Sequence, residues 1–236
     1  MSIVDLTAAR DARAEAGPRL PAGVTVYERL RQMIVTLALP PGAAINRSEL
    51  QASFGLSSTP VRDALTRLGE EGLVDIKAQS ATRVSLIDVA AARQAQFLRR
   101  AVEQEAVRLL AALPDKEFEP ELRSLLDAQT LRAAAGDIDG FDTLDRTFHR
   151  RLVELAGAPD LFSLVRARCG HIDRIRRLHL PVRGKAEEVV RDHARILKAI
   201  VAGNAEKAQA RVRDHLARSL AYVETLRAAH PDFFRG

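Results

Sequence analysis

Two residues in the second half of the chain have the types and spacing of metal ligands. Asp145 and His149 stand four residues apart in the segment DRTFH, so both side chains leave one face of a helix, one turn apart. Phe141, Phe148 and Leu152 flank this pair at helical spacing, which makes the face a buried one. The spacing therefore suits a single metal ion held inside the protein.

Two further histidines point inward from other predicted helices. His193 shares a helical stripe with Ile196 and Ile200, and His215 shares one with Val212. A single histidine on an apolar stripe is most simply a core residue whose ring nitrogens are satisfied by neighbours. Three such histidines and an aspartate on three helices favour a shared site over three separate core residues.

A second chemistry is indicated by the segment SSTPVRDAL, residues 57–65. Ser57 is a good helix N-cap, and Pro60 is tolerated in a first turn. The inward stripe of this helix consists of Val61, Ala64, Leu65 and Leu68. Hydroxyls and a helix N-terminus can hold phosphates, and an arginine can reach guanine. The outward residues are therefore candidates for DNA contact: Ser58, Thr59, Arg62 and Thr66.

The surrounding pattern predicts a winged helix-turn-helix over residues 24–87. A helix from Val26 ends before PPG at 40–42, NRSE at 46–49 forms a capping box for a second helix, and Gly72 ends the third. Residues 73–87 alternate around a polar tip, as a hairpin does. The pattern leaves an alternative open, in which the third helix is an ordinary amphipathic helix with a solvated arginine.

The rest of the chain predicts a mainly α protein with two domains. Residues 1–23 show no sustained apolar stripe and are expected to form a flexible tail. Residues 91–228 are expected to form an all-α six-helix bundle. Breakers at the joints give the predicted helices as 91–112, 116–135, 138–156, 159–180, 185–202 and 205–228.

The composition of the chain indicates a helical protein but does not identify a binding partner. The 236 residues are 47% hydrophobic and only 4% aromatic, which suits helices packed through aliphatic faces. The net charge is +5, but residues 24–87 carry seven Lys and Arg against six acids, a difference of only +1, so DNA binding must depend on where the cations point. One cysteine, no signal-peptide pattern and no bilayer-length apolar run predict a cytoplasmic protein.

The segment from VYERLRQ to LGEEGLV, with PPG and STPVRDAL inside it, closely resembles the DNA-binding domain of the GntR family of bacterial transcriptional regulators. The resemblance implies that the third helix contacts operator DNA and that the hairpin tip enters the minor groove. The family usually has arginine at Ser58, often a basic residue at Ser48, and glycine at Ala81, so the operator of this chain is expected to differ. The predicted DNA-binding residues are Arg47, Ser57, Ser58, Thr59, Arg62, Thr82 and Arg83.

Residues 91–228 resemble the FCD effector-binding domain of the FadR subfamily of these regulators. The resemblance implies that Asp145, His149, His193 and His215 bind a divalent metal ion. Three imidazoles and one carboxylate suit Zn²⁺ or Ni²⁺, and less exclusively Mn²⁺ or Fe²⁺, with open positions that a small carboxylate effector can fill. The resemblance also implies that Arg99 faces the effector. The alternative for Arg99 is a surface arginine paired with the residue four positions later.

Three functions remain in competition on the sequence. The leading one is a metabolite-responsive regulator, expected to be a repressor, that acts as a homodimer on a palindromic operator. A metal-dependent hydrolase or lyase would use the same three histidines and aspartate, but no convincing general base accompanies them, and residues 24–87 would have no purpose. An architectural DNA-binding dimer would bind neither metal nor effector. Metal analysis together with a turnover assay separates the three.

Overall fold

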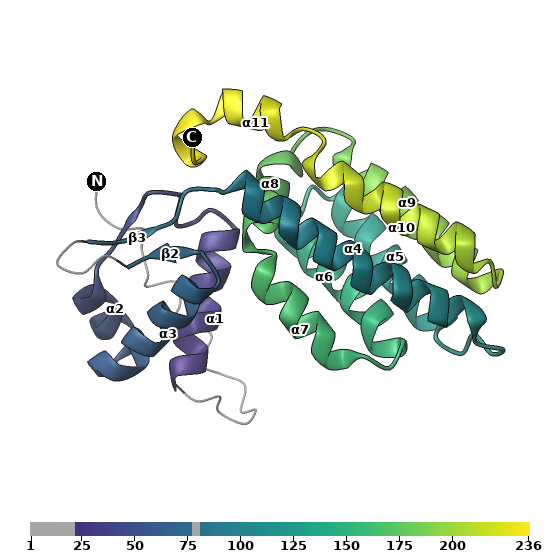
Figure 1. The fold of residues 1–236 in the computed structure, drawn as a ribbon, viewed down its shortest axis with the longest axis horizontal. Helices are drawn as coiled ribbons and strands as arrows, with labels where there is room; N and C mark the ends of the chain where they lie inside the picture. Colours follow the sequence, from purple (N-terminus) through teal and green to yellow (C-terminus); the bar gives the residue numbers. More distant parts are fainter. Residues whose placement is uncertain (1–21, 77–80) are drawn as a thin grey trace. The chain divides into compact units, whose positions relative to one another are not determined.

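The computed structural model describes residues 22–76 and 81–236, which divide into two compact units (Figure 1). The first unit contains the described residues up to Val89 together with Ala229–Gly236, and the second contains Ala90–Ala228. No helix in the described part of the chain is long and apolar enough to cross a bilayer. Most of the predicted N-terminal tail and the tip of the predicted hairpin lie outside the described residues.

Three helices form the body of the first unit: α1 (Ala22–Val35), α2 (Arg47–Phe54) and α3 (Ser58–Glu70). The predicted cap of α2 is present, because the side-chain oxygen of Asn46 accepts from the backbone N–H groups of Ser48 at 2.9 Å and Glu49 at 3.3 Å. The Glu49 carboxylate in turn accepts from the Asn46 side-chain amide at 2.8 Å. Gly55 then ends α2 in the left-handed conformation, with φ of 64°.

Helix α3 buries the stripe predicted from its sequence. Val61, Ala64, Leu65 and Leu68 are all buried, and they join Leu30 of α1 in one apolar core. Ser57 occupies the N-cap position, but its hydroxyl makes no capping hydrogen bond. The start of α3 therefore has free backbone N–H groups and a free hydroxyl at the surface.

The sheet of this unit has three strands, one more than the predicted hairpin. The strands β1 (Ala44–Ile45), β2 (Val74–Asp75) and β3 (Thr82–Val84) pair antiparallel in the order β1-β3-β2. β1 is only two residues long, which is too short for an alternating pattern to reveal it. It is a strand only through its pairing with β3, in which Ala44 lies opposite Arg83, 39 positions later in the chain.

Helices make up the second unit, which confirms the mainly α fold class. Two of the six predicted helical stretches are divided. The stretch 159–180 breaks at Cys169, next to the poor helix former Gly170, and 205–228 is interrupted by a tight 3₁₀ turn, η2, at Arg218–Leu220. The helices are α4 (Val89–Ala112), α5 (Glu119–Ala134), α6 (Ile138–Leu155), α7 (Pro159–Arg168), α8 (Gly170–His179), α9 (Lys185–Val201), α10 (Ala205–Ala217) and α11 (Val223–Ala229).

The core of the second unit is aliphatic, with one aromatic residue beside the predicted site. Leu110 of α4, Leu122 of α5 and Ile200 of α9 are fully buried in one cluster with Phe148 of α6 and Val212 of α10. This cluster fixes the rotation of each helix about its axis. The same rotation turns the polar residues on these stripes toward one another.

The cap of α2 gives a test of the fold of the first unit. Replacing Asn46 by Ala removes the acceptor of two backbone N–H groups and should lower the free energy of unfolding by about 1 kcal/mol. Chemical denaturation monitored by circular dichroism measures this change. Asn46→Asp keeps the acceptor oxygen and serves as the control. Equal stability of the Ala variant and the parent would contradict the cap.

Candidate functional site

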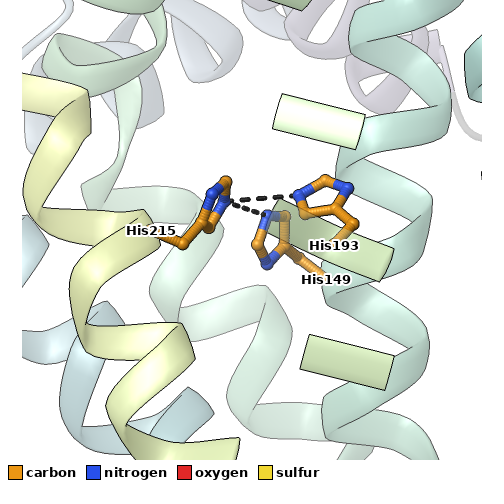
Figure 2. A group of neighbouring side chains, drawn as sticks. All are labelled: His149, His193 and His215. Atoms are coloured by element: carbon orange, nitrogen blue, oxygen red, sulfur yellow. Dashed lines mark hydrogen bonds between the residues drawn. The ribbon is translucent and has the colours of Figure 1, made fainter. Parts of the chain in front are cut away.

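Three histidines from three helices converge inside the second unit (Figure 2). His149 of α6, His193 of α9 and His215 of α10 are all buried. The Nε2 atom of His215 lies 3.3 Å from Nε2 of His193 and 3.3 Å from Nε2 of His149. The ligand atoms of all three rings lie within 4.8 Å of one another, which is the spacing of donors around a single ion.

The other ring nitrogen of His149 is committed to a carboxylate. Its Nδ1 lies 2.7 Å from Oε2 of Glu103 on α4. Burial raises the pKa of Glu103, but the charges and hydrogen bonds of Arg99 and His149 outweigh it and lower that pKa to about 2. An ionised carboxylate only accepts, so Nδ1 carries the proton. Burial and the Arg99 charge lower the pKa of His149 to about 4, so the ring is neutral and its Nε2 carries the lone pair, 3.3 Å from Nε2 of His215.

A buried amide sets the tautomer of His193. Nδ1 of His193 lies 2.8 Å from Oε1 of Gln129 on α5. The Gln129 amide nitrogen donates to the backbone oxygen of Leu144 at 3.2 Å, which orients the amide oxygen toward the histidine. His193 therefore donates from Nδ1 and presents an unprotonated Nε2. Burial, with His215 and His149 close by, lowers the pKa of His193 well below its ordinary value.

His215 follows the same pattern through a second carboxylate. Its Nδ1 lies 3.4 Å from Oδ2 of Asp192 on α9. Burial raises the pKa of Asp192, but the hydrogen bond from His215 and nearby positive charges lower it overall. All three histidines thus turn Nε2 toward a common point while Nδ1 faces an acceptor on another helix. This arrangement is typical of histidine ligands oriented by hydrogen bonds at their other nitrogen.

Asp145 completes the predicted set from a position beside the histidines. It is fully buried, and its Oδ1 lies 3.7 Å from Nε2 of His193 and has no hydrogen-bond partner. Its Oδ2 accepts from Arg176 of α8 at 2.6 Å. Burial raises the pKa of Asp145, but the Arg176 charge lowers it far below its usual range. One oxygen of this buried carboxylate is therefore left without a partner beside His193, whereas the donors close enough to one another to hold a single ion are those of the three histidines.

Arg99, predicted to face an effector, is a buried residue paired with Glu103. Its Nε donates to Oε1 of Glu103 at 2.5 Å, the partner expected of a surface arginine, yet Arg99 is only 7% exposed. Burial lowers the pKa of Arg99, but the Glu103 carboxylate raises it overall, and Asp145 adds to the increase. The guanidinium therefore lies among the charges of the histidine site.

A pocket lies next to His215 in the second unit. Arg176 and Asp192 reach it from the site just described, and the 3₁₀ turn η2 contributes Arg218 and Ser219 to its wall. Arg218 donates to Oδ1 of Asp192 at 3.0 Å. The remaining wall residues are His179, Leu180, Lys185 and Val189.

In the first unit, the residues predicted to contact DNA at the start of α3 are at the surface. Ser57, Ser58, Thr59 and Arg62 are all exposed. The second arginine of this helix, Arg67, instead lies 3.7 Å over the ring of Tyr27. The Arg62 side chain is 69% exposed, and its pairing with Asp63, at 3.8 Å, is loose.

The other residues predicted to contact DNA lie on α2 and β3. Arg47 is exposed and donates to the hydroxyl of Thr82 at 3.0 Å. Thr82 itself is only 4% exposed, so in this structure it positions Arg47 and offers little surface of its own. Arg83 is exposed and donates to the backbone oxygen of Gly42 at 3.0 Å.

The residues that hold the three histidines and Asp145 in place were not predicted from the sequence. Glu103, Gln129, Asp192 and Arg176 were not assigned to the site. A signal for two of them exists, because Gln129 continues the buried stripe of Leu122 and Leu126, and Glu103 precedes the stripe of Val107 and Leu110. A polar residue on an apolar stripe requires a buried partner.

Comparison with known families accounts for both units. Residues 23–84 match the family described as bacterial regulatory proteins, gntR family, and residues 94–218 match the FCD domain. A transcriptional regulator in an unstable DNA locus of Streptomyces ambofaciens, itself uncharacterized, is 39% identical over 209 residues, covering 89% of this chain and 88% of that protein. The transcriptional repressor RspR of Escherichia coli K12 is 26% identical over 220 residues, covering 93% and 96%.

Solved structures agree on the fold. Escherichia coli McbR/YncC superimposes with a TM-score of 0.75 at 20% identity, covering 88% of this chain and 99% of that one. A GntR regulator from Rhodococcus sp. RHA1, described as a putative one, gives 0.72 at 23% identity, covering 86% and 97%. These relatives are transcriptional regulators and not enzymes. The chain is a member of the GntR family of DNA-binding transcriptional regulators, with an FCD domain as its second unit.

Proposed function

We propose that this regulator is a cytoplasmic repressor whose operator binding responds to a small carboxylate held at a divalent metal ion in the FCD domain. The convergence of three buried Nε2 atoms supports the sensing half of this proposal. The family supplies the DNA-binding half. The name of the Escherichia coli relative, a transcriptional repressor, supports repression over activation.

Arg62 is the residue expected to read the operator. It is the more exposed arginine of α3, with a side chain 69% exposed against 54% for Arg67, whose guanidinium lies over the Tyr27 ring. Ser57 and the exposed hydroxyls of Ser58 and Thr59 lie at the helix N-terminus, where phosphate oxygens bind favourably. Arg47 on α2 and Arg83 on β3 are held by hydrogen bonds to Thr82 and Gly42. They are the cations available to make the guanine contact that Ser58 cannot make.

The metal is expected to be held by His149, His193, His215 and Asp145. Three imidazoles and a carboxylate favour Zn²⁺ or Ni²⁺. When bound, such an ion supplies a Lewis-acidic centre with coordination positions for a small anion. The Asp145 oxygen that faces His193 is the one free to ligate, because Arg176 occupies the other.

Charge balance around the histidines supports an anionic effector. Three ion pairs surround them, and each pair is neutral by itself: Arg99 with Glu103, Arg176 with Asp145, and Arg218 with Asp192. A divalent ion therefore adds two uncompensated positive charges in a buried place. A carboxylate on the ion offsets part of this excess. Arg176, which reaches both Asp145 and the adjoining pocket, and the buried Arg99 are the cations expected to assist it.

The regulator is proposed to act as a homodimer, since helix-turn-helix dimers bind paired half-sites about one DNA turn, roughly 34 Å, apart. An apolar groove between α4 and α7 supports this. It is lined by Ala101, Leu109 and Leu161, with Leu109 39% and Leu161 42% exposed. A second copy of the chain would cover these side chains from water.

Arg62→Ala should weaken binding to operator DNA by about 1–3 kcal/mol without changing the fold. The operator is first selected from a random duplex pool with the full chain, and affinities are then measured by fluorescence anisotropy at one salt concentration. Arg132→Ala, which removes an exposed arginine from the second unit, is the matched control. Parent-like affinity of Arg62→Ala would remove α3 from the contact surface.

Metal binding has a graded test. His193→Ala should abolish binding of Zn²⁺ or Ni²⁺, and Glu103→Ala should weaken it by about 10- to 100-fold because the His149 ring loses its orienting acceptor. Competition with a chelating dye measures both affinities. The ion should also raise the melting temperature of the parent but not of His193→Ala, by mass action.

Glu187→Ala is the control for that series, because Glu187 is exposed on α9, the helix that carries His193. DNA binding by the first unit should persist in every one of these variants. If His193→Ala bound the ion as the parent does, the histidines would be core residues and the sensor proposal would fail, even with DNA binding intact.

Leu161→Glu should weaken self-association at least about tenfold, because it places a charge in the apolar groove. Sedimentation equilibrium measures the dissociation constant. Leu131→Glu, at a leucine that is 71% exposed on α5, tests whether any surface charge has this effect. Equal dissociation constants for Leu161→Glu and the parent would exclude this groove as the dimer interface.

A further inference from the structure

The chain passes between its two units twice. It leaves the first unit after Val89 and returns to it at Ala229. Residues 230–236 then bond to Ile87 and Asp88, which lie just before the first crossing. The backbone N–H of Ile87 donates to the Phe233 oxygen at 2.8 Å, and the N–H of Arg235 donates to the Ile87 oxygen at 2.9 Å.

Side chains reinforce this junction inside the first unit. Phe234, which forms a parallel bridge with Ile87, is 5% exposed, and Ile87 is fully buried. Arg235 also donates to the Asp88 carboxylate at 3.1 Å. Two backbone hydrogen bonds, an ion pair and a buried phenylalanine are more than a free chain end requires, so residues 230–236 are an anchored segment.

The same stretch of chain begins at the metal site. His215 is followed three residues later by Arg218, the first residue of η2. Asp192 joins the two, because its Oδ2 faces His215 Nδ1 at 3.4 Å while its Oδ1 accepts from Arg218 at 3.0 Å. A change in the position of the His215 ring therefore acts on η2 both through the backbone and through Asp192.

The segment also forms part of the pocket wall. Arg218 and Ser219 line the pocket next to His215. Tyr222, between η2 and α11, lies with its ring 4.2 Å from that of His179, another wall residue. From there the chain runs through the short helix α11 directly into residues 230–236. The segment 218–236 thus has one end at the sensor site and the other in the DNA-binding unit.

We infer that residues 218–236 form a strap that passes the state of the metal site in the FCD domain to the DNA-binding unit, by pulling on Ile87 next to the start of α4. The inference rests on the proposed function and adds the route by which the two sites are coupled. The strap is a covalent link between the units in addition to the connection at Val89. A substitution at its anchor, Phe234, can release it without changing a proposed metal ligand or DNA contact.

The test uses Zn²⁺ alone as the input and the selected operator duplex as the output. DNA affinity of the full chain is measured with Zn²⁺ and after removal of metal by a chelator, and the ratio of the two dissociation constants is the coupling. The parent should give a ratio that differs from one by about fivefold or more. Phe234→Asp, which introduces a charge at the anchor, should give a ratio near one while binding Zn²⁺ as tightly as the parent.

Two further variants separate release of the strap from loss of folding. Phe234→Leu keeps an apolar anchor and should retain the parent ratio. A chain that ends at Ala229 removes the anchor without introducing a charge and should behave as Phe234→Asp does. Hydrogen exchange at the amides of Ile87 and Arg235 should respond to Zn²⁺ in the parent, because these amides make the anchoring bonds.

The possible results separate failure of the strap from failure of the proposed function. If Phe234→Asp and the shortened chain keep the parent ratio, the strap is overturned, although metal and DNA binding stand. A parent whose DNA affinity does not change with Zn²⁺ overturns the strap in the same way. Failure of the parent to bind Zn²⁺ refutes the sensor half of the proposed function itself, and the strap with it.

Discussion

The FCD domain is organised by one constraint, the need to bring three buried imidazoles together with Nε2 facing the same place. Each ring is oriented by its Nδ1, which faces an acceptor on another helix: Glu103 on α4, Gln129 on α5 and Asp192 on α9. Five helices are therefore tied to the geometry of one site. The arginines and carboxylates around the histidines are arranged in ion pairs: Arg99 with Glu103, Arg176 with Asp145, and Arg218 with Asp192.

The DNA-binding unit is built on a separate core with its own buried ion pair. Arg31 of α1 donates to Glu71, just after α3, at 2.9 Å, and the Tyr27 hydroxyl donates to the same carboxylate. This contact and the apolar core hold α3 against α1, so its outer face is fixed without help from the FCD domain. Because the two cores are independent, loss of metal ligands should leave the fold of the DNA-binding unit intact. The chain connects the two units twice, after Val89 and again at Ala229.

The features of this arrangement that depend on neighbouring residues in the chain could be predicted from the sequence. The α3 stripe, the Asn46 cap and the inward direction of the three histidines each follow from helical periodicity, and the structure bears them out. Features that depend on distant pairing were not predictable. β1 is two residues long and exists only through β3, and Glu103 and Gln129 meet histidines 46 and 64 positions away on other helices. The breaks at Cys169 and Arg218 were missed because neither a proline nor a run of polar residues marks them; Arg218 turns to reach Asp192, which is a tertiary contact.

The central claim, that the histidine lone pairs surround a metal ion, is tested most directly by X-ray absorption at the zinc edge of the full chain loaded with one equivalent of Zn²⁺. The account predicts a spectrum with three imidazole nitrogens at about 2.0–2.1 Å, together with oxygen at a similar distance from Asp145. A spectrum with fewer than two imidazoles, or with the ion coordinated by oxygen alone, would contradict it.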